Sequence, residues 1–213
     1  MRNNNYYIAI ILLLFVSLGF SACSKNEDNG LSSKDAGLSM KLDGKEWQAT
    51  ITTLFTEEHE TSQLGEYYYV YLSGSRIIEK NSNTEDDLAE TIGLYINIPA
   101  SKFRNPKGTY PIIFEETEMG HAWGIFGSST DIRDATTYVS GDPNNKKQVV
   151  GNLEITGFEI GNQNVLGHQS DKEGYTKLSG NFELDVYPIN GVGSKLKITE
   201  GKFNLTGAMN VGW

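Results

Sequence analysis

The side chains most able to form a binding surface are the tyrosines of residues 67–71, which read Tyr-Tyr-Tyr-Val-Tyr. Successive side chains of a β-strand point to opposite faces, so Tyr67, Tyr69 and Tyr71 share one face and the residues between them share the other. If the second face is core, three phenol rings line the first, where they could stack on sugars or anchor a protein. Cross-strand aromatic packing is the commoner reason for such a stripe. Binding by these three tyrosines is therefore a hypothesis.

Carboxylates are the main candidates for catalysis, because a glycosidase needs one protonated and one ionised carboxyl group. Glu115, Glu116 and Glu118 stand in a predicted loop beside His121 and Trp123, a grouping that could line a sugar cleft. A solvated acidic loop with Trp123 at the edge of the core is the simpler interpretation. We predict no catalytic residue and keep Trp123 as a candidate binding residue. A carboxylate-based glycan hydrolase is the alternative.

Metal binding has less support. The histidines of the chain are His59, His121 and His168. They lie far apart in the sequence, and a single cysteine cannot build a thiolate cage, so no metal site is predicted. Residues 85–87 and the pair Asp131 and Asp134 could offer oxygen ligands to calcium, but neither has the alternate-residue spacing of a calcium loop. No cofactor is predicted, and calcium is the alternative.

The net charge excludes one class of partner. The chain has 18 Lys and Arg against 27 Asp and Glu, a formal charge of −9. Proteins bind duplex nucleic acid mainly by neutralising phosphates with basic side chains. An acidic chain without a basic cluster is therefore not expected to bind nucleic acid.

The elements that must position these residues are strands, because apolar residues recur with a period of two along most of the chain. Residues 91–98 and 178–186 each place alternate apolar side chains on one face, and Pro99 and Pro188 end these runs. Asp43-Gly44 fits a type I′ hairpin turn. The alternation slips by one at Gly157, as a β-bulge requires.

These patterns predict an all-β domain of about nine or ten antiparallel strands. Two stacked sheets or one closed sheet could bury so many half-apolar strands. We favour a two-sheet β-sandwich because strand lengths are uneven and two long stretches, residues 78–90 and 115–135, read as irregular. A lipocalin-like β-barrel is the alternative.

The N-terminus carries an export signal. Arg2 precedes an apolar run over residues 7–20, and the small residues Ser21 and Ala22 stand directly before Cys23, the single cysteine. The segment resembles the type II signal of bacterial lipoproteins, which implies cleavage before Cys23 and a lipid on its sulfur. Residues 1–22 are then the signal peptide and residues 23–36 the lipidated Cys23 with a polar, flexible tether. Residues 37–213 form a single β domain.

Two further resemblances concern location and family. The sequence Ser-Lys-Asn-Glu-Asp after Cys23 is similar to the signal that sends Bacteroidetes lipoproteins to the outer face of the outer membrane. The order of Asp-Gly-Lys-Glu-Trp at 43–47, Gly-Thr-Tyr at 108–110, Leu-Ser-Gly-Asn-Phe at 178–182 and Ile-Thr-Glu-Gly-Lys-Phe at 198–203 resembles a Bacteroidetes lipoprotein family of unknown function. The resemblance implies a lipid-anchored β domain and no catalytic residue.

Together these observations lead to one expectation and three alternatives. We expect a lipoprotein of the outer membrane, held by its lipid and facing the cell surface, that binds glycan or an envelope protein without catalysis. The alternatives are the glycan hydrolase, a carrier of apolar ligands if the fold is a barrel, and a purely structural role in the envelope.

Overall fold

The computed structural model describes residues 37–61, 65–79, 88–114, 118–129, 136–142, 145–165 and 168–207. They all belong to one compact unit, residues 33–209. Its elements are β1 Gly37–Leu42, β2 Lys45–Gln48, β3 Ile51–Thr61, β4 Gly65–Glu79, β5 Leu88–Pro99, the 3₁₀ turn η1 Ala100–Lys102, β6 Gly108–Ile112, β7 Ala122–Ser129, β8 Thr136–Ser140, β9 Gly151–Val165, β10 His168–Pro188 and β11 Leu196–Thr206.

Hydrogen bonds join the eleven strands into one sheet, in the order β2-β1-β11-β10-β9-β6-β7-β5-β4-β3, and β8 pairs with both β10 and β7. Neighbouring strands are antiparallel except β6 and β7, which meet in parallel at Ile112 and Ala122. The prediction of an all-β fold is confirmed. The described residues form eleven strands, where nine or ten were expected, and one pair of neighbouring strands is parallel.

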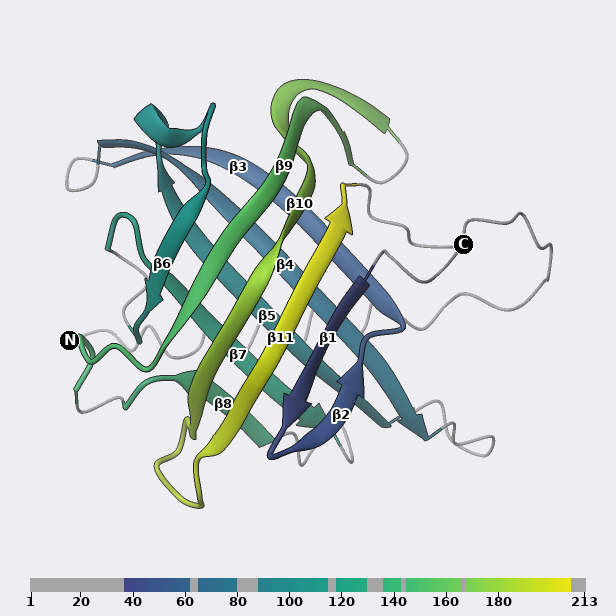
Figure 1. The fold of residues 1–213 in the computed structure, drawn as a ribbon, viewed down its shortest axis with the longest axis vertical. Coiled ribbons are helices and arrows are strands. Elements are labelled where there is room, and N and C mark those ends of the chain that lie inside the picture. The colour runs from purple at the N-terminus through teal and green to yellow at the C-terminus, as the bar shows by residue number, and fades with distance from the viewer. Residues whose placement is uncertain are drawn as a thin grey trace, which may run out of the picture. The chain divides into compact units, whose positions relative to one another are not determined.

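The sheet folds over on itself into two layers (Figure 1). The front layer of Figure 1 contains β1, β2, β6, β9, β10 and β11, and the strands β3, β4, β5 and β7 of the back layer cross behind it. Facing layers are a feature of the sandwich that we favoured. Hydrogen bonding that continues from one layer to the other through β6, β7 and β8 is a feature of the barrel alternative.

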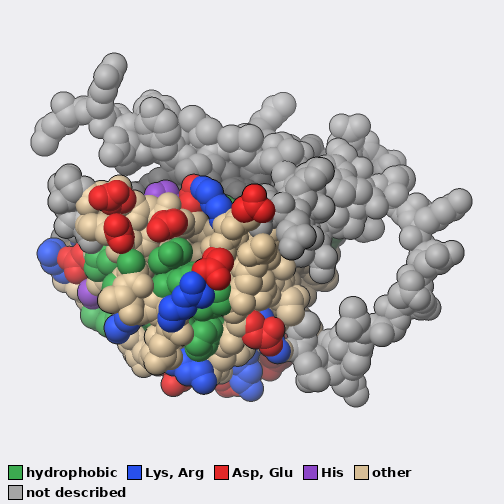
Figure 2. All heavy atoms as spheres, turned by 90° about the horizontal axis from the view of Figure 1, so that it is seen from above, with side chains coloured by type: hydrophobic (Ala, Val, Ile, Leu, Met, Phe, Trp, Pro, Cys, Tyr) green, Lys and Arg blue, Asp and Glu red, His purple; other side chains and the backbone are tan. Residues whose placement is uncertain are grey.

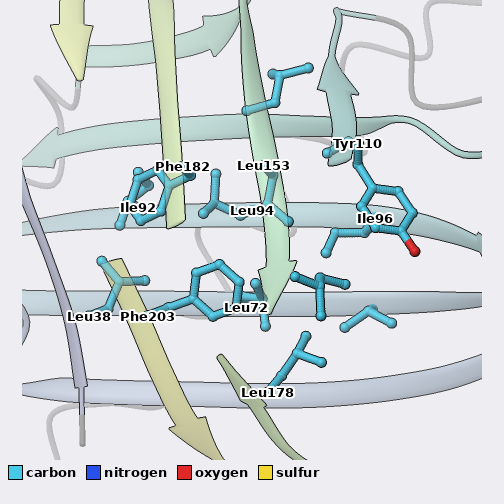
Figure 3. Packing of buried hydrophobic residues seen from close by; sticks show 14 of the residues in the cluster. Leu38, Leu72, Ile92, Leu94, Ile96, Tyr110, Leu153, Leu178, Phe182 and Phe203 are labelled. Atoms are coloured by element: carbon cyan, nitrogen blue, oxygen red, sulfur yellow. The ribbon is translucent and has the colours of Figure 1, made fainter. Parts of the chain in front are cut away.

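The core lies between the layers and follows the predicted alternation. Ile92, Leu94, Ile96 and Ile98 of β5 all have 1 % exposure or less. Side chains of the front layer pack against them, as Figure 3 shows for Phe182 and Leu153. Each buried side chain of this size adds about 1.5–3 kcal/mol of transfer free energy. The interior between the layers is thus occupied by side chains of the chain itself.

Two predicted local features are confirmed. Asp43 and Gly44 both have positive φ, 48° and 79°, and join β1 to β2 in the expected hairpin turn. In β9, Ile155 pairs with Gly180 and Gly157 pairs with Ser179, so the register shifts by one residue between them. This is the bulge predicted at Gly157.

One prediction about irregular structure is wrong. We expected residues 115–135 to be a long irregular stretch, but they contain β7, which pairs with β5 along its whole length. Residues 122–127 of this strand are all buried. A strand covered on both faces has no reason to alternate apolar and polar residues, so its sequence lacks the period of two.

A side-chain bridge joins β3, the end strand of the back layer, to the front layer. The backbone N–H of Thr56 donates to Gln163 Oε1 at 3.0 Å, and Gln163 Nε2 donates to the carbonyl of Thr56 at 2.8 Å. The hydroxyl of Thr56 also accepts a bond from the backbone N–H of Tyr175 at 3.1 Å. The amide of Gln163 therefore takes the place of a neighbouring strand at this point.

A second connection joins β2 to the back layer. Glu90 Oε2 accepts hydrogen bonds from Trp47 Nε1 at 2.7 Å and from Arg76 Nε at 2.8 Å. The guanidinium of Arg76 also lies over the Trp47 ring, 5.5 Å from its centroid. The two connections therefore hold the strands of the back layer against those of the front layer.

Candidate functional site

The predicted tyrosine stripe lies on β4 with the orientation that the hypothesis requires. Val70 and Leu72 are fully buried, and Tyr68 packs against the core by stacking on Phe103 at 3.8 Å. The condition that this side of the strand is core is therefore met. Tyr67, Tyr69 and Tyr71 consequently project from the outer surface of the back layer, where each is half-buried.

Strand register places further aromatic residues beside the stripe. His59 of β3 is opposite Tyr67, Tyr95 of β5 is opposite Tyr71, and Trp123 of β7 is opposite Tyr95. We call the set His59, Tyr67, Tyr69, Tyr71, Tyr95 and Trp123 the aromatic face. It spans four strands that are neighbours in the sheet.

The rings of the aromatic face contact one another in an unbroken series. His59 stacks on Tyr67 at 5.5 Å and meets Tyr69 edge-on at 5.8 Å. Tyr95 lies 5.6 Å from Tyr69, 4.7 Å from Tyr71 and 3.8 Å from Trp123 between ring centroids. Such pairs add about 0.5–1.5 kcal/mol each beyond their buried area. The rings therefore hold each other in place.

The packing fixes which part of each ring points outward from the sheet. Tyr95 and Trp123 are directly opposite on adjacent strands and nearly parallel, with 7° between their planes. Tyr71 approaches Tyr95 from β4, the strand on its other side, at 34°. Strands lie about 4.8 Å apart, so rings stacked across that gap stand upright on the sheet. The faces of Tyr95 are thus directed at its neighbours rather than outward.

Trp123 differs from the sequence-based expectation in one respect. It lies in the strand β7 and not in a loop, and only 8 % of it is exposed. Its indole Nε1 is buried with no hydrogen-bond partner among the described residues. An unpaired buried N–H is costly. Within the aromatic face, Trp123 mainly packs against one side of Tyr95, and little of its own surface is exposed.

Charge is scarce on the aromatic face. Within the described parts of β3, β4, β5 and β7, Glu57 is the single carboxylate on this side, and it is paired with His59 at 3.1 Å. The other side chains around the rings are apolar or neutral. They are Thr53, Phe55, Ser73, Asn97 and Ile125. Burial raises the pKa of Tyr71, and hydrogen bonds to Ser73 and Tyr95 partly offset this.

Glu118 and His121 lie beside this face, before β7. Glu118 forms an ion pair with Lys147 at 2.8 Å, and this hydrogen bond holds its pKa below the ordinary value. The backbone carbonyl of Glu118 accepts a bond from Asn97 Nδ2 at 3.3 Å. An ionised carboxylate is suited to a base or nucleophile and unsuited to the acid role that a glycosidase also needs. Glu115 and Glu116 lie outside the described residues.

The three histidines are not brought together: His59 is on β3, His121 precedes β7 and His168 begins β10. Among the residues that the structure describes, no group of three or more His, Cys, Asp or Glu is placed to hold a metal ion. The calcium candidates, residues 85–87, Asp131 and Asp134, lie outside the described residues, as do Cys23 and the predicted signal and tether.

In the described part of the chain, no helix is long and apolar enough to cross a membrane. Comparison of the chain with protein-family models, with curated proteins and with solved structures finds no match. The function of the aromatic face is therefore argued from its own geometry.

Sequence reasoning missed two members of the aromatic face, His59 and Tyr95. The signal for Tyr95 was present, because Leu94 and Ile96 were predicted to point inward and Tyr95 stands between them. Its contact with the tyrosine stripe depends on the pairing of β4 with β5, which the sequence does not state.

Proposed function

We propose that the protein is a surface-exposed lipoprotein, anchored in the outer membrane through Cys23, and that its β domain is a non-catalytic binding module. The aromatic face is its binding surface, and the ligand is a glycan or a protein of the cell envelope. The observation that carries the proposal is the unbroken series of ring contacts across β3, β4, β5 and β7 on a side with little charge.

Two physical arguments support binding at this surface. Tyrosine offers a rigid, amphipathic contact area, and rings already packed in place lose little conformational freedom when a ligand binds. Cores of protein interfaces are also rich in aromatic residues and poor in charge. The aromatic face has both properties, in a chain with a formal charge of −9.

The alternatives gain less from the structure. A carrier of apolar ligands needs an interior space, whereas side chains from both layers meet in the described core. A hydrolase needs a carboxyl group that stays protonated, whereas the hydrogen bond from Lys147 holds the pKa of Glu118 below its ordinary value.

The test measures binding of the purified mature chain to isolated envelopes of the bacterium that produces it, using a label on the chain. We expect saturable binding without release of products. Changing Tyr67, Tyr69 and Tyr71 together to Ser should weaken it at least about tenfold, as for interface residues whose truncation matters most. Turnover of any envelope polymer would contradict the non-catalytic part of the proposal.

The matched control is a triple substitution on the other layer. Lys177, Asn181 and Lys202 of the β10 and β11 strands project outward there. Changing these three to Ser should leave binding unchanged. Equal loss in both triple variants would remove the aromatic face as the binding surface, and a thermal unfolding curve for each variant would establish that it is folded.

A further inference from the structure

The strand β3 belongs both to the aromatic face and to the end of the sheet. Among the described residues, its backbone pairs with β4 alone. Its outward side chain His59 packs on Tyr67 and Tyr69 of β4. An end strand has a hydrogen-bonded neighbour on one side only, so it opens more easily than an interior strand. Whatever holds the other edge of β3 therefore also decides how firmly His59 is held.

The other edge of β3 is attached to the front layer at Thr56. This residue is 2 % exposed and is the last buried residue of β3, and Glu57, Glu58 and Glu60 beyond it are exposed. Figure 2 looks onto this end of the domain and shows acidic side chains gathered along one side of it. Charged side chains of this kind are common on edge strands that are open to solvent. Thr56 is thus the last buried anchoring point of β3 before His59.

The side chain that makes the attachment, Gln163 of β9, reaches β3 by crossing over Gly174 of β10. Gly174 does not have a positive φ, so its backbone conformation does not explain the glycine. A Cβ atom at this position would overlap Cδ and Nε2 of Gln163. The missing side chain of Gly174 therefore leaves the space through which the amide of Gln163 reaches Thr56, at 3.0 and 2.8 Å.

The backbone N–H of Tyr175 reports whether β3 is in place. The pairing of β11 with β10 ends at Thr206, opposite Lys177, and β3 lies beside β10 beyond that point. There the N–H of Tyr175 donates to the hydroxyl of Thr56 at 3.1 Å. Gln163 takes no part in this bond. A substitution at Gln163 therefore exposes the N–H of Tyr175 only if β3 moves away from β10.

We propose that Gln163 is a positioning residue for the aromatic face. Its amide holds β3 against the front layer, and β3 in turn holds His59 against Tyr67 and Tyr69. Without the bridge, β3 separates from β10 at Thr56 and the His59 side of the aromatic face loses its fixed position. A surface that is in its binding arrangement for only part of the time has an affinity reduced by that fraction. The inference deepens the proposed function and rests on it.

The first measurement is amide hydrogen exchange of the mature chain without any ligand. Gln163→Leu should raise the exchange rate of the Tyr175 N–H at least about tenfold, because unsatisfied buried groups of Thr56 favour opening. Amides that join β4 to β5 should exchange as in the parent chain. Gly174→Ala should give the same result, since it displaces Gln163 and keeps the amide. Asn162→Leu, at the exposed neighbouring position, is the control.

Unchanged exchange of the Tyr175 N–H in both Gln163→Leu and Gly174→Ala would overturn the role of Gln163. Faster exchange of all amides to the same extent would also overturn it, because the bridge would then stabilise the whole domain rather than hold β3.

The second measurement is binding to isolated envelopes. Gln163→Leu and Gly174→Ala should each weaken binding several-fold, and Asn162→Leu should leave it unchanged. His59→Ala should weaken binding as well. In the His59→Ala chain, Gln163→Leu should cause little further loss, because Gln163 acts through His59. Losses that multiply in the double variant would mean that the two residues act independently, and would overturn the positioning role.

The two measurements separate this inference from the proposed function. Faster exchange of the Tyr175 N–H together with unchanged envelope binding would overturn the link between the bridge and the aromatic face, and would leave the proposed function intact. Absence of saturable binding by the parent chain would overturn the proposed function and, with it, this link, whatever the exchange measurement shows.

Discussion

The outer surfaces of the two layers are built by the same alternation but present different chemistry. On the front layer, the outward positions of β9, β10 and β11 carry side chains such as Glu154, Lys177, Asn181 and Lys202. On the back layer, the corresponding positions carry the aromatic face. The comparison shows that a period of two decides only which residues point outward. The type of residue found there indicates what the surface is for.

The two surfaces also differ in how their side chains are held. Ion pairs of the front layer, such as Lys195 with Asp185 at 2.6 Å and Lys177 with Glu159 at 3.5 Å, are exposed to solvent. Exposed pairs of this kind contribute little to stability. The rings of the back layer are in mutual contact over four strands. The second surface is thus held by a continuous series of ring contacts.

The largest expected effect is on the back layer. Tyr95→Ala removes the ring that contacts Tyr69, Tyr71 and Trp123, and we expect it to lower the free energy of unfolding by about 3 kcal/mol. Asn181→Ala, at an exposed front position, should change it by less than about 0.5 kcal/mol. Unfolding in urea measures both. Equal losses would mean that the packed rings add nothing to stability.

The next effect concerns the bridge that joins the layers. Gln163→Leu keeps a similar volume but leaves the N–H and C=O of Thr56 without their amide partner. Each unsatisfied buried group costs about 1–3 kcal/mol, so we expect a loss of about 2 kcal/mol in urea unfolding, the lower end of the range for two such groups. Asn162→Leu, at the exposed neighbouring position, is the control. A small effect of Gln163→Leu would show that water or another strand replaces the bridge.

Much of this fold could be predicted because local rules decide it. Asp43 and Gly44 suit the positive φ of a hairpin turn, and the slip of apolar residues at Gly157 marks a bulge. The orientation of Tyr69 followed from its place between Tyr68 and Val70, which are on the core side. Each of these inferences needs only residues that are close in the sequence.

The rest depends on contacts between distant segments. The strand β7 was missed because it is buried on both sides and shows no alternation. The neighbours of Tyr95 are fixed by the registers of β4 with β5 and of β5 with β7. Gln163 and Thr56 are 107 residues apart, so nothing in the sequence around either indicates the bridge. The sequence therefore predicts the tyrosine stripe on β4, but it does not predict which residues of β3, β5 and β7 lie beside it.

The last expected effect appears only at alkaline pH and concerns two core tyrosines. Burial raises the pKa of Tyr110 to about 12 and raises that of Tyr175 further. Both are hydrogen-bonded inside the domain, Tyr110 to the carbonyl of Pro106 at 2.7 Å and Tyr175 to that of Phe103 at 2.9 Å. The folded state therefore favours their neutral form.

The sign of the pH effect follows from that preference. In the unfolded chain a tyrosine loses its proton near its ordinary pKa of 10.0. Above that pH the unfolded state binds fewer protons than the folded state, so the free energy of unfolding falls as the pH rises. The stabilisation is complete below pH 10, and the part due to Tyr110 is lost by about pH 12. Urea unfolding at a series of pH values measures the decline.

Tyr110→Phe is the control for this decline, since it removes the ionisable hydroxyl and keeps the ring. The variant should be less stable at neutral pH, because the carbonyl of Pro106 loses its donor, and its stability should fall less steeply between pH 10 and pH 12. An unchanged slope would assign the alkaline loss to other groups.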